Sequence, residues 1–541
     1  MAPIKRINKV IQSCLEYFPS VAIAGVVVIP LIFVLQSAFH IDGAIWQRLW
    51  SARIPALLAN SAMLVVTVTI GSVAIGFLLA FLIERTDLPL RRIFRPLLIA
   101  PLITPCYIIA ICYVNFFGIN GLGEKLFATF GITARLPSIY GFWGAAAILT
   151  MGAYPYIYTT ISASLQMFNE RFTEAAKCLG HNGFERLLFL KIPLLLPALT
   201  SGMILVAFYV LSDFGVVSML RYPTFVNTIY EQMTGRYNYA TASALSSILI
   251  GLTILLFIIQ DRLLRRKVYQ SVKIKKPQAK AYQLGLWKIP AAIFVVLVIS
   301  AGLIIPVGIL IYWFWKSFSL SASALIWMAP IEDLIHSGVN SIGLSSVVAT
   351  ITVVLTFPLA YLSIRQPSSV VSRWLTWLAQ SGIALPGVLI ALGLLLVFKK
   401  LAPHYTFSIA ALILAFFIHF FAQSFQTTSS GLKQISKKFE ESARLLGNSS
   451  LQSFWWVTRP LLNPVLATAW ILVFLSSMRE LPASLLLRPA GFDPLTVKVW
   501  TAASEGFYEQ SAAPALLIVL LSLPLIIIMT RAQERHTTST D

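Results

Sequence analysis

Three ionisable side chains, Asp213, Arg479 and Glu480, fall inside long apolar runs of this 541-residue sequence. An ionised group inside a membrane costs roughly a few kcal/mol, so such residues normally face protein or water and often mark a path for polar solutes. We therefore expect the three side chains either to line a translocation path or form its outer gate, or to hold the protein together as a structural ion pair.

Motifs for common enzymatic chemistry are absent from the sequence. It contains no Gly-x-x-x-x-Gly-Lys-Ser/Thr phosphate loop, no nucleophile elbow and no His-Glu-x-x-His zinc pair. The four cysteines do not have the spacing of metal ligands. Of the six histidines, only His419 falls clearly inside an apolar run, where a lone histidine is more often a hydrogen-bonding partner than a ligand. We expect a protein that is not an enzyme and has no cofactor, whereas the presence of a metal site stays open.

Two polar loops share a pattern of residues and spacing. The loop 174–197 begins with Glu-Ala-Ala and reaches Gly180 six residues after its glutamate. The loop 441–464 begins with Glu-Ser-Ala and reaches Gly447 at the same spacing. In both loops a proline follows the glycine after 13 residues. Two copies with identical spacing argue against an incidental amphipathic hairpin.

The residue types predict the local structure of each loop. An acid is favoured at the positive end of a helix, so each glutamate is expected to begin a short helix. Gly180 and Gly447 are expected to end that helix in the left-handed conformation. Asn182 and Ser449 follow two residues later and are good caps for a second short helix. The proline after each glycine is expected to break the second helix before the chain re-enters the membrane.

The loops belong to a longer internal repeat. Arg85 recurs 280 residues later as Arg365, and the loops recur at an offset of 267 residues. The second offset makes Asp213 equivalent to Glu480. It also permits an ion pair between Arg479 and Asp213 across the axis of the repeat. Halves that each contain an even number of spans are parallel, with their axis along the membrane normal, and a substrate path would lie on that axis.

Apolar runs of membrane-spanning length position these residues. Apolar residues make up 57% of the sequence and charged residues 11%. Runs of about 20 residues match the hydrocarbon thickness of a bilayer, and their lack of alternation favours helices over barrel strands. We count twelve, near 18–38, 58–83, 96–115, 139–160, 198–219, 241–260, 289–314, 340–363, 375–398, 405–427, 464–487 and 512–530.

The net charge of +20 is distributed as in membrane proteins and not as in nucleic-acid-binding proteins. Most Lys and Arg residues fall on one side if the N-terminus is cytoplasmic, which is the positive-inside bias. This orientation makes both termini and both loops cytoplasmic, and the first apolar run reads as an uncleaved helix. The expected organisation is a first half at 1–260, a basic cytoplasmic linker at 261–288, and a second half at 289–541.

The two loops resemble the EAA loop of ABC importer permeases, in which Glu-Ala-Ala is followed by three residues, Gly and a Pro-containing segment. The second copy departs from the pattern at Ser442. The resemblance implies an all-α polytopic membrane protein with the type I ABC importer permease fold, about 12 transmembrane helices in two parallel six-helix repeats. In that family the loop is the coupling helix that docks on the ATP-binding subunit. The coupling residues implied here are Glu174, Ala175, Ala176, Gly180, Glu441, Ala443 and Gly447.

The fused form and the run around Asp213 look similar to bacterial ferric-iron permeases. The resemblance implies two ATP-binding subunits, an external solute-binding protein, and a place in the bacterial cytoplasmic (inner) membrane. ATP hydrolysis is expected in a separate subunit. A permease for another solute such as thiamine stays open, as does a proton-coupled secondary transporter that uses Asp213 and Glu480, although the latter gives no reason for matched loops. A membrane enzyme is disfavoured because no polar cluster gathers at one interface.

Overall fold

The computed structural model is built from α-helices. Over the described residues, the β-type pairing is confined to an isolated bridge between Thr86 and Tyr282. The structure describes residues 22–23, 25–102, 104–132, 135–167, 178–180, 182, 185, 189, 192–265, 282–320, 331–365 and 385–538.

The helix Gly25–Phe39 is the first long helix among the described residues of the first half. The long helices α3 and α7 pack along each other, and α10 packs against both. A short 3₁₀ segment at Ala100–Leu102 precedes α5. The helices that follow the first are α2 (Gly43–Ala52), α3 (Ile54–Arg85), α4 (Arg91–Ile99), α5 (Cys106–Phe117), α6 (Leu122–Thr129), α7 (Phe142–Met167), α10 (Ile192–Ser212), α11 (Gly215–Met219), α12 (Phe225–Thr234) and α13 (Tyr239–Arg265).

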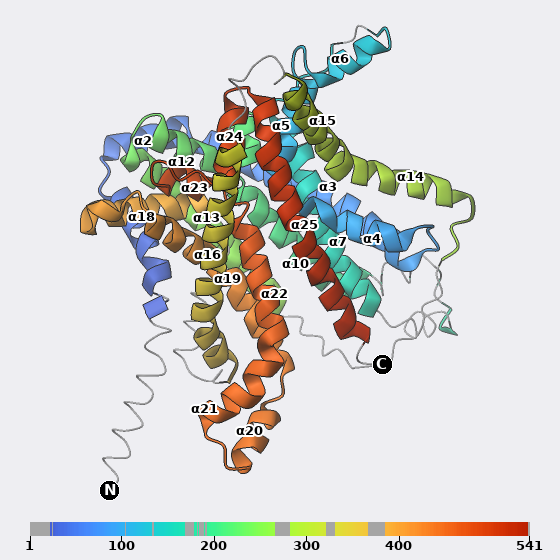
Figure 1. Ribbon diagram of the computed structural model, residues 1–541, viewed down its shortest axis with the longest axis vertical. Helices are drawn as coiled ribbons and strands as arrows, with labels where there is room; N and C mark the ends of the chain where they lie inside the picture. The colour runs from blue at the N-terminus through green and yellow to red at the C-terminus, as the bar shows by residue number, and fades with distance from the viewer. Residues whose placement is uncertain are drawn as a thin grey trace.

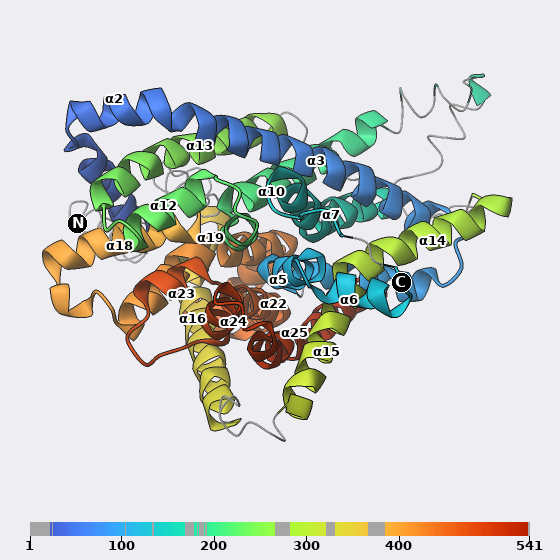
Figure 2. The same cartoon turned by 90° about the horizontal axis from the view of Figure 1, so that it is seen from above.

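The second half contains a matching bundle in which α16, α19 and α22 pack against one another. Figure 2 shows α16 and α22 on the opposite side of α5 from α3 and α13. Two π-helical segments, Ser300–Ile304 and Phe454–Thr458, join neighbouring helices. The helices are α14 (Lys288–Ile299), α15 (Ile305–Leu320), α16 (Ile331–Arg365), α18 (Gly387–Leu401), α19 (Ile409–Gln434), α20 (Lys437–Leu445), α21 (Ser450–Ser453), α22 (Arg459–Ser477), α23 (Pro482–Leu487), α24 (Leu495–Ser504) and α25 (Tyr508–Thr538).

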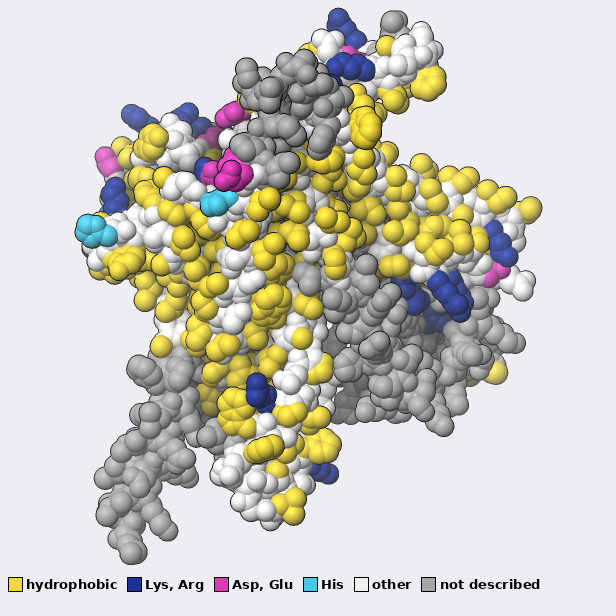
Figure 3. All heavy atoms as spheres, in the orientation of Figure 1, with side chains coloured by type: hydrophobic (Ala, Val, Ile, Leu, Met, Phe, Trp, Pro, Cys, Tyr) yellow, Lys and Arg dark blue, Asp and Glu magenta, His cyan; other side chains and the backbone are white. Residues whose placement is uncertain are grey.

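Seven of the described helices are long and apolar enough to cross a membrane, and two bent helix pairs raise this number to nine. Apolar side chains cover most of the surface between the two ends of the molecule in Figure 3, as expected of a lipid-facing belt. The all-α membrane fold is therefore confirmed. The count of twelve spans stays a prediction, because part of the expected span 375–398 lies outside the described residues.

Three expected spans are interrupted rather than continuous. The expected span 96–115 bends by 90° between Arg91–Leu102 and Cys106–Phe117, where Pro105 removes a backbone donor and precedes the new helix. The expected span 198–219 divides at the end of α10 into α10 and α11. Its repeat 464–487 divides in the same way into α22 and α23. The matched break shows that the repeat includes the interruption itself.

Each half places its first helix against the other half. In α18, Gly393 lies so close to the helix Gly25–Phe39 that an added Cβ would be 2.6 Å from the carbonyl oxygen of Pro30. In the reciprocal contact, the hydroxyl of Tyr113 on α5 donates to the carbonyl of Ala301, 2.7 Å away, between α14 and α15. Both halves thereby contribute to one continuous apolar core.

The start of the second half is held against the first half by a polar clip centred on Asp87. The N–H of Tyr282 donates to the carbonyl of Arg85 at 2.8 Å, and the Asp87 N–H donates back to the carbonyl of Tyr282 at 3.2 Å. The Asp87 carboxylate accepts from the Leu284 N–H at 2.9 Å and pairs with the Lys288 ammonium at 2.7 Å. The Lys288 contact, followed by the Leu284 N–H, lowers the pKa of Asp87 below its usual 3.8.

Candidate functional site

The second loop forms a helical hairpin that projects beyond the bundle at the lower end of Figure 1. Its first helix, α20, begins at Lys437, and the hydroxyl of Ser436 caps it by accepting from the Lys438 N–H. The expectation that the helix begins at Glu441 is wrong by four residues. The acid in its first turn is Glu440, whereas Glu441 lies in the middle of the helix and faces solvent.

The glycine corner after α20 has the predicted conformation. Gly447 adopts φ +92°, in the left-handed region. Its N–H donates to the carbonyl of Arg444, and the Asn448 N–H donates to the carbonyl of Ala443. These two hydrogen bonds form a Schellman motif, which satisfies the free carbonyls at the end of α20. Ala443 therefore contributes to the corner through its backbone, while its side chain is buried.

The second arm of the hairpin is joined to the membrane helix rather than separated from it. Ser449 caps α21 as predicted, because its hydroxyl accepts from the Gln452 N–H while the Gln452 side chain accepts from the Ser449 N–H. The chain then passes through the π segment Phe454–Thr458 directly into α22. The expectation that Pro460 breaks the helix is wrong. Pro460, which has no backbone N–H to donate, follows the π segment closely and stands at the second position of α22.

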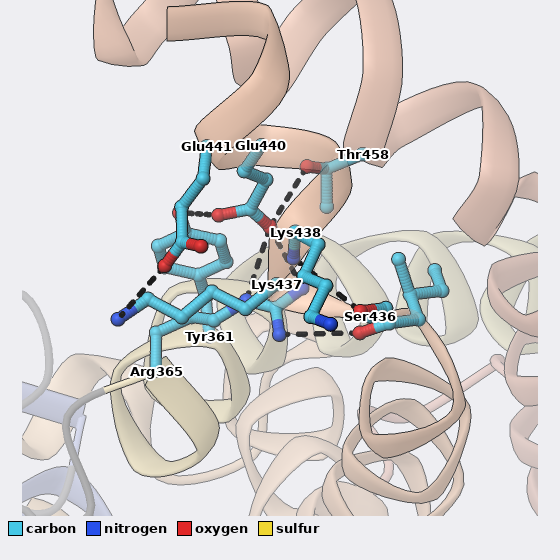
Figure 4. Close-up of polar contacts among 9 residues, drawn as sticks. Tyr361, Arg365, Ser436, Lys437, Lys438, Glu440, Glu441 and Thr458 are labelled. Carbon is cyan, nitrogen blue, oxygen red and sulfur yellow. Dashed lines mark hydrogen bonds and ion pairs between the residues drawn. The ribbon is translucent and has the colours of Figure 1, made fainter. Parts of the chain in front are cut away.

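A buried ion pair that sequence reasoning missed fixes this hairpin to the bundle (Figure 4). The Glu440 side chain is only 4% exposed, and its Oε1 lies 2.7 Å from Nη2 of Arg365, the last residue of α16. The carboxylate also accepts from the hydroxyl of Tyr361 at 3.1 Å and from that of Thr458 at 3.0 Å. Arg365 was identified only as a repeated residue, and no sequence signal pairs it with an acid 75 positions away.

The first loop is described only in part, and Glu174, Ala175 and Ala176 lie outside the described residues. Gly180 adopts φ +83°, as predicted. The side-chain oxygen of Asn182 accepts from the Glu185 N–H at 2.9 Å, and the Glu185 carboxylate accepts from the Asn182 N–H at 3.1 Å. This reciprocal cap has the same spacing as the one at Ser449, so the two loops share a left-handed glycine followed by a capped turn.

Matching apolar side chains project from equivalent positions of the two loops. Leu179 is 78% exposed, and Leu446, 267 residues later, is 83% exposed. Phe189 is 73% exposed, and its equivalent Trp456 is 79% exposed. An exposed leucine directly before each glycine corner forms a contact surface in duplicate, which is typical of a docking site used twice.

The two membrane acids occupy equivalent positions of the repeat: Asp213 directly follows α10, and Glu480 lies three residues after the end of α22. The N–H of Asp213 donates to the carbonyl of Val210, and the N–H of Glu480 donates to that of Ser477. The Asp213 carboxylate accepts from two N–H groups at the start of α11, at 3.0 and 3.3 Å. That of Glu480 accepts from the Ala483 N–H in α23, at 3.5 Å. Asp213 thus acts as a helix cap, which supports a structural role.

Arg479 joins the two halves without pairing with Asp213. Its Nε donates to the carbonyl of Leu475 one turn back, and its Nη1 donates to the carbonyl of Leu102 in the first half. An ion pair between Arg479 and Asp213 is therefore not formed in this structure. Glu480 instead has a neighbour that the sequence did not assign: the Nε2 of His419 lies 3.6 Å from its Oε2.

The comparison with known proteins agrees with this duplicated arrangement. Residues 72–269 and 352–539 each match the family described as binding-protein-dependent transport system inner membrane component. The chain belongs to this family. As two copies of the family domain follow each other in one polypeptide, the internal repeat of this inner membrane component is confirmed.

Relatives of this inner membrane component include other transport permeases. It is 28% identical over 488 residues to the Fe(3+)-transport system permease protein FbpB 2 of Haemophilus influenzae, covering 89% of this chain and 91% of that protein. It is 22% identical over 525 residues to the ferric transport system permease protein FbpB of Actinobacillus pleuropneumoniae, covering 93% of this chain and 75% of that protein. A putative 2-aminoethylphosphonate permease PhnV of Salmonella typhimurium is 30% identical over 176 residues, covering 32% of this chain and 66% of that protein.

Proposed function

We propose that this inner membrane component is the translocation subunit of an ATP-driven importer for ferric iron. The choice of ferric iron as substrate is supported by the similarity to two ferric permeases over about nine-tenths of the chain. The similarity to the phosphonate permease covers only about a third of the chain. The external binding protein captures the ion, and this chain provides the passage. It contains no phosphate-binding loop, so ATP hydrolysis takes place in a partner.

The two loops are the docking points for two ATP-binding subunits. Supporting this role, each loop presents an exposed leucine and a rigid glycine corner, and the two copies have equivalent exposed positions. The exposed carboxylate of Glu441 lies on the same hairpin as Leu446, so it is available to a partner. The buried pair of Glu440 and Arg365 gives this hairpin a firm attachment, which transmits movement of the partner to α16.

The membrane acids and Arg479 form the gate of the path. Glu480 faces the ion, while Asp213 and Arg479 hold the surrounding turns in place. Support comes from the positions of the three residues at matched breaks in the fifth helix of each half, and from the contact of Arg479 with the opposite half. In this arrangement both termini and both hairpins face the cytoplasm, as the distribution of Lys and Arg indicates.

Reconstitution tests the proposed function directly. The permease is placed in liposomes together with the ATP-binding subunits, and a ferric-iron-binding protein is added outside with radioactive ferric iron. We expect iron to accumulate with ATP inside and to be unaffected by an uncoupler of the proton gradient. Uptake that follows the proton gradient would favour a secondary transporter. Uptake of another solute, but not of iron, would contradict the proposal that ferric iron is the substrate.

A further inference from the structure

The side chains of Glu480 and His419 are neighbours, but they lie too far apart to form a good hydrogen bond. Their nearest atoms, Oε2 and Nε2, are 3.6 Å apart, whereas N–H···O hydrogen bonds are about 2.7–3.2 Å long. Two ligands of one small metal ion, each about 2.1 Å from it, lie about 3.0 Å apart at 90° and about 3.6 Å apart at 120°. The observed separation lies at the upper end of this range, so an approach of about 0.6 Å would bring both side chains to the spacing of neighbouring ligands at 90°.

The carboxylate of Glu480 is packed against the starts of α18 and α23. Gly387, the first residue of α18, packs so closely that a Cβ there would lie 2.2 Å from Oε1 of Glu480. The start of α23 provides the Ala483 N–H to the same oxygen. Both contacts involve Oε1, so Oε2 is the oxygen that lies nearest to His419.

One ring nitrogen of His419 makes no hydrogen bond to any described residue. Its Nδ1 is buried and has no hydrogen-bond partner in the described structure. One turn further along α19, Gln423 bonds to Ser476 of α22 at 3.0 Å, so the two helices already have a conventional polar contact beside the pair. The link between these helices therefore does not depend on His419.

From this geometry we propose that His419 and Glu480 form a transit site for a metal cation inside the membrane. The inference rests on the proposed function and adds the place where the ion is held on its way through. The carboxylate supplies an oxygen ligand suited to a hard ion, and imidazole is a ligand that iron accepts. Among the described residues no group of three His, Cys, Asp or Glu side chains is placed to hold a metal. Two protein ligands, completed by water, hold the ion weakly enough to release it.

The test compares variants in the reconstituted importer described above. Glu480→Gln and His419→Ala should each lower the iron imported per ATP hydrolysed at least tenfold, while ATP hydrolysis stimulated by the loaded binding protein is retained. Gly387→Ala should act in the same direction, because its Cβ displaces the carboxylate. The matched control is Ser476→Ala, which removes the neighbouring contact with Gln423 and should leave the ratio unchanged.

A measurement on the unaltered protein covers the case in which a variant fails to assemble. The assembled importer is incubated with ferrous iron and ascorbate, and oxidised histidines are identified by mass spectrometry after bulk radicals are scavenged. Oxidation should concentrate at His419 rather than at the exposed His336 and His404. Equal iron import per ATP in the variants, or no selective oxidation, would overturn the site. Failure of the unaltered importer to transport any iron would instead contradict the proposed substrate.

Discussion

Arg365, at the end of a membrane helix, and Glu440, in the projecting hairpin, form an ion pair 2.7 Å long that is almost completely shielded from solvent. Three elements meet there, since Tyr361 belongs to α16, Glu440 to α20, and Thr458 to the π segment that leads into α22. Such a pair is a firm attachment, because neither charge can be left alone without a large loss of stability.

Neutralising one partner of this pair should destabilise the protein strongly. Glu440→Gln leaves the Arg365 guanidinium without its counter-charge, and breaking a buried pair in this way costs about 3–5 kcal/mol. We expect a lower melting temperature of the purified permease and weaker co-purification of ATP-binding subunits. The control is Lys437→Ala, which disrupts the exposed 3.9 Å pair with Glu441 on the same helix and should change stability by about 1 kcal/mol or less. Equal effects of both variants would contradict the special role of the buried pair.

Local features of the hairpins followed from the sequence, whereas their attachment did not. Gly180, Gly447 and the two caps depend on neighbouring residues, so residue type and spacing were enough to predict their conformations. The contact of Glu440 with Arg365 spans 75 positions, and it depends on how α16 packs beside α22. The misplaced start of α20 has a different, local cause, because Ser436 is a better cap than Glu440, the residue before Glu441.

The glycine corners should tolerate asparagine but not valine. Gly447→Val forces a β-branched residue into the left-handed region, at a cost of about 1–2 kcal/mol, and distorts the surface beside Leu446. We expect this variant to insert normally and to lose iron uptake together with docking of the ATP-binding subunits. Gly447→Asn should retain both, since asparagine adopts this conformation more readily. Full uptake by Gly180→Val and Gly447→Val combined would show that the corners have no part in coupling.

The exposed leucines should contribute to docking without contributing to stability. Leu179→Ser and Leu446→Ser remove apolar surface that only a partner would bury, a loss of roughly 1.5–3 kcal/mol of binding free energy at each position. We expect weaker binding of purified ATP-binding subunits and an unchanged melting temperature. Leu401→Ser, which changes a leucine of similar exposure at the end of α18, is the matched control. Unaltered binding by the double variant would exclude these leucines from the interface.

Asp213 should behave as a helix cap in stability measurements. Asp213→Ala removes the acceptor for two N–H groups of α11 and should cost about 1 kcal/mol, whereas Asp213→Asn keeps a side-chain oxygen in place and should cost little. Exchanging the charges by Asp213→Arg with Arg479→Asp should not restore folding, because Arg479 bonds to the Leu102 carbonyl instead. Recovery of the melting temperature in the exchanged protein would prove this interpretation wrong.

The clip at Asp87 predicts a distinct dependence on pH. As its pKa is lowered in the folded protein, the clip stabilises fully above the ordinary value of 3.8 and is lost only as the pH falls through the folded pKa. Asp87→Asn should therefore lower the melting temperature equally at pH 5 and pH 8, and the difference from the unaltered protein should shrink below about pH 4. A difference that grows in acid would have the wrong sign for this carboxylate.

The presence of both halves in one polypeptide affects how the sequence of this permease can evolve. In a permease assembled from two identical chains, every substitution appears on both sides of the axis. Here the residue equivalent to Glu480 is the shorter Asp213, and the residue equivalent to Arg479 is Ser212. A single gene with two copies of the domain can therefore acquire a histidine or an arginine in one copy alone, so the two copies are free to specialise.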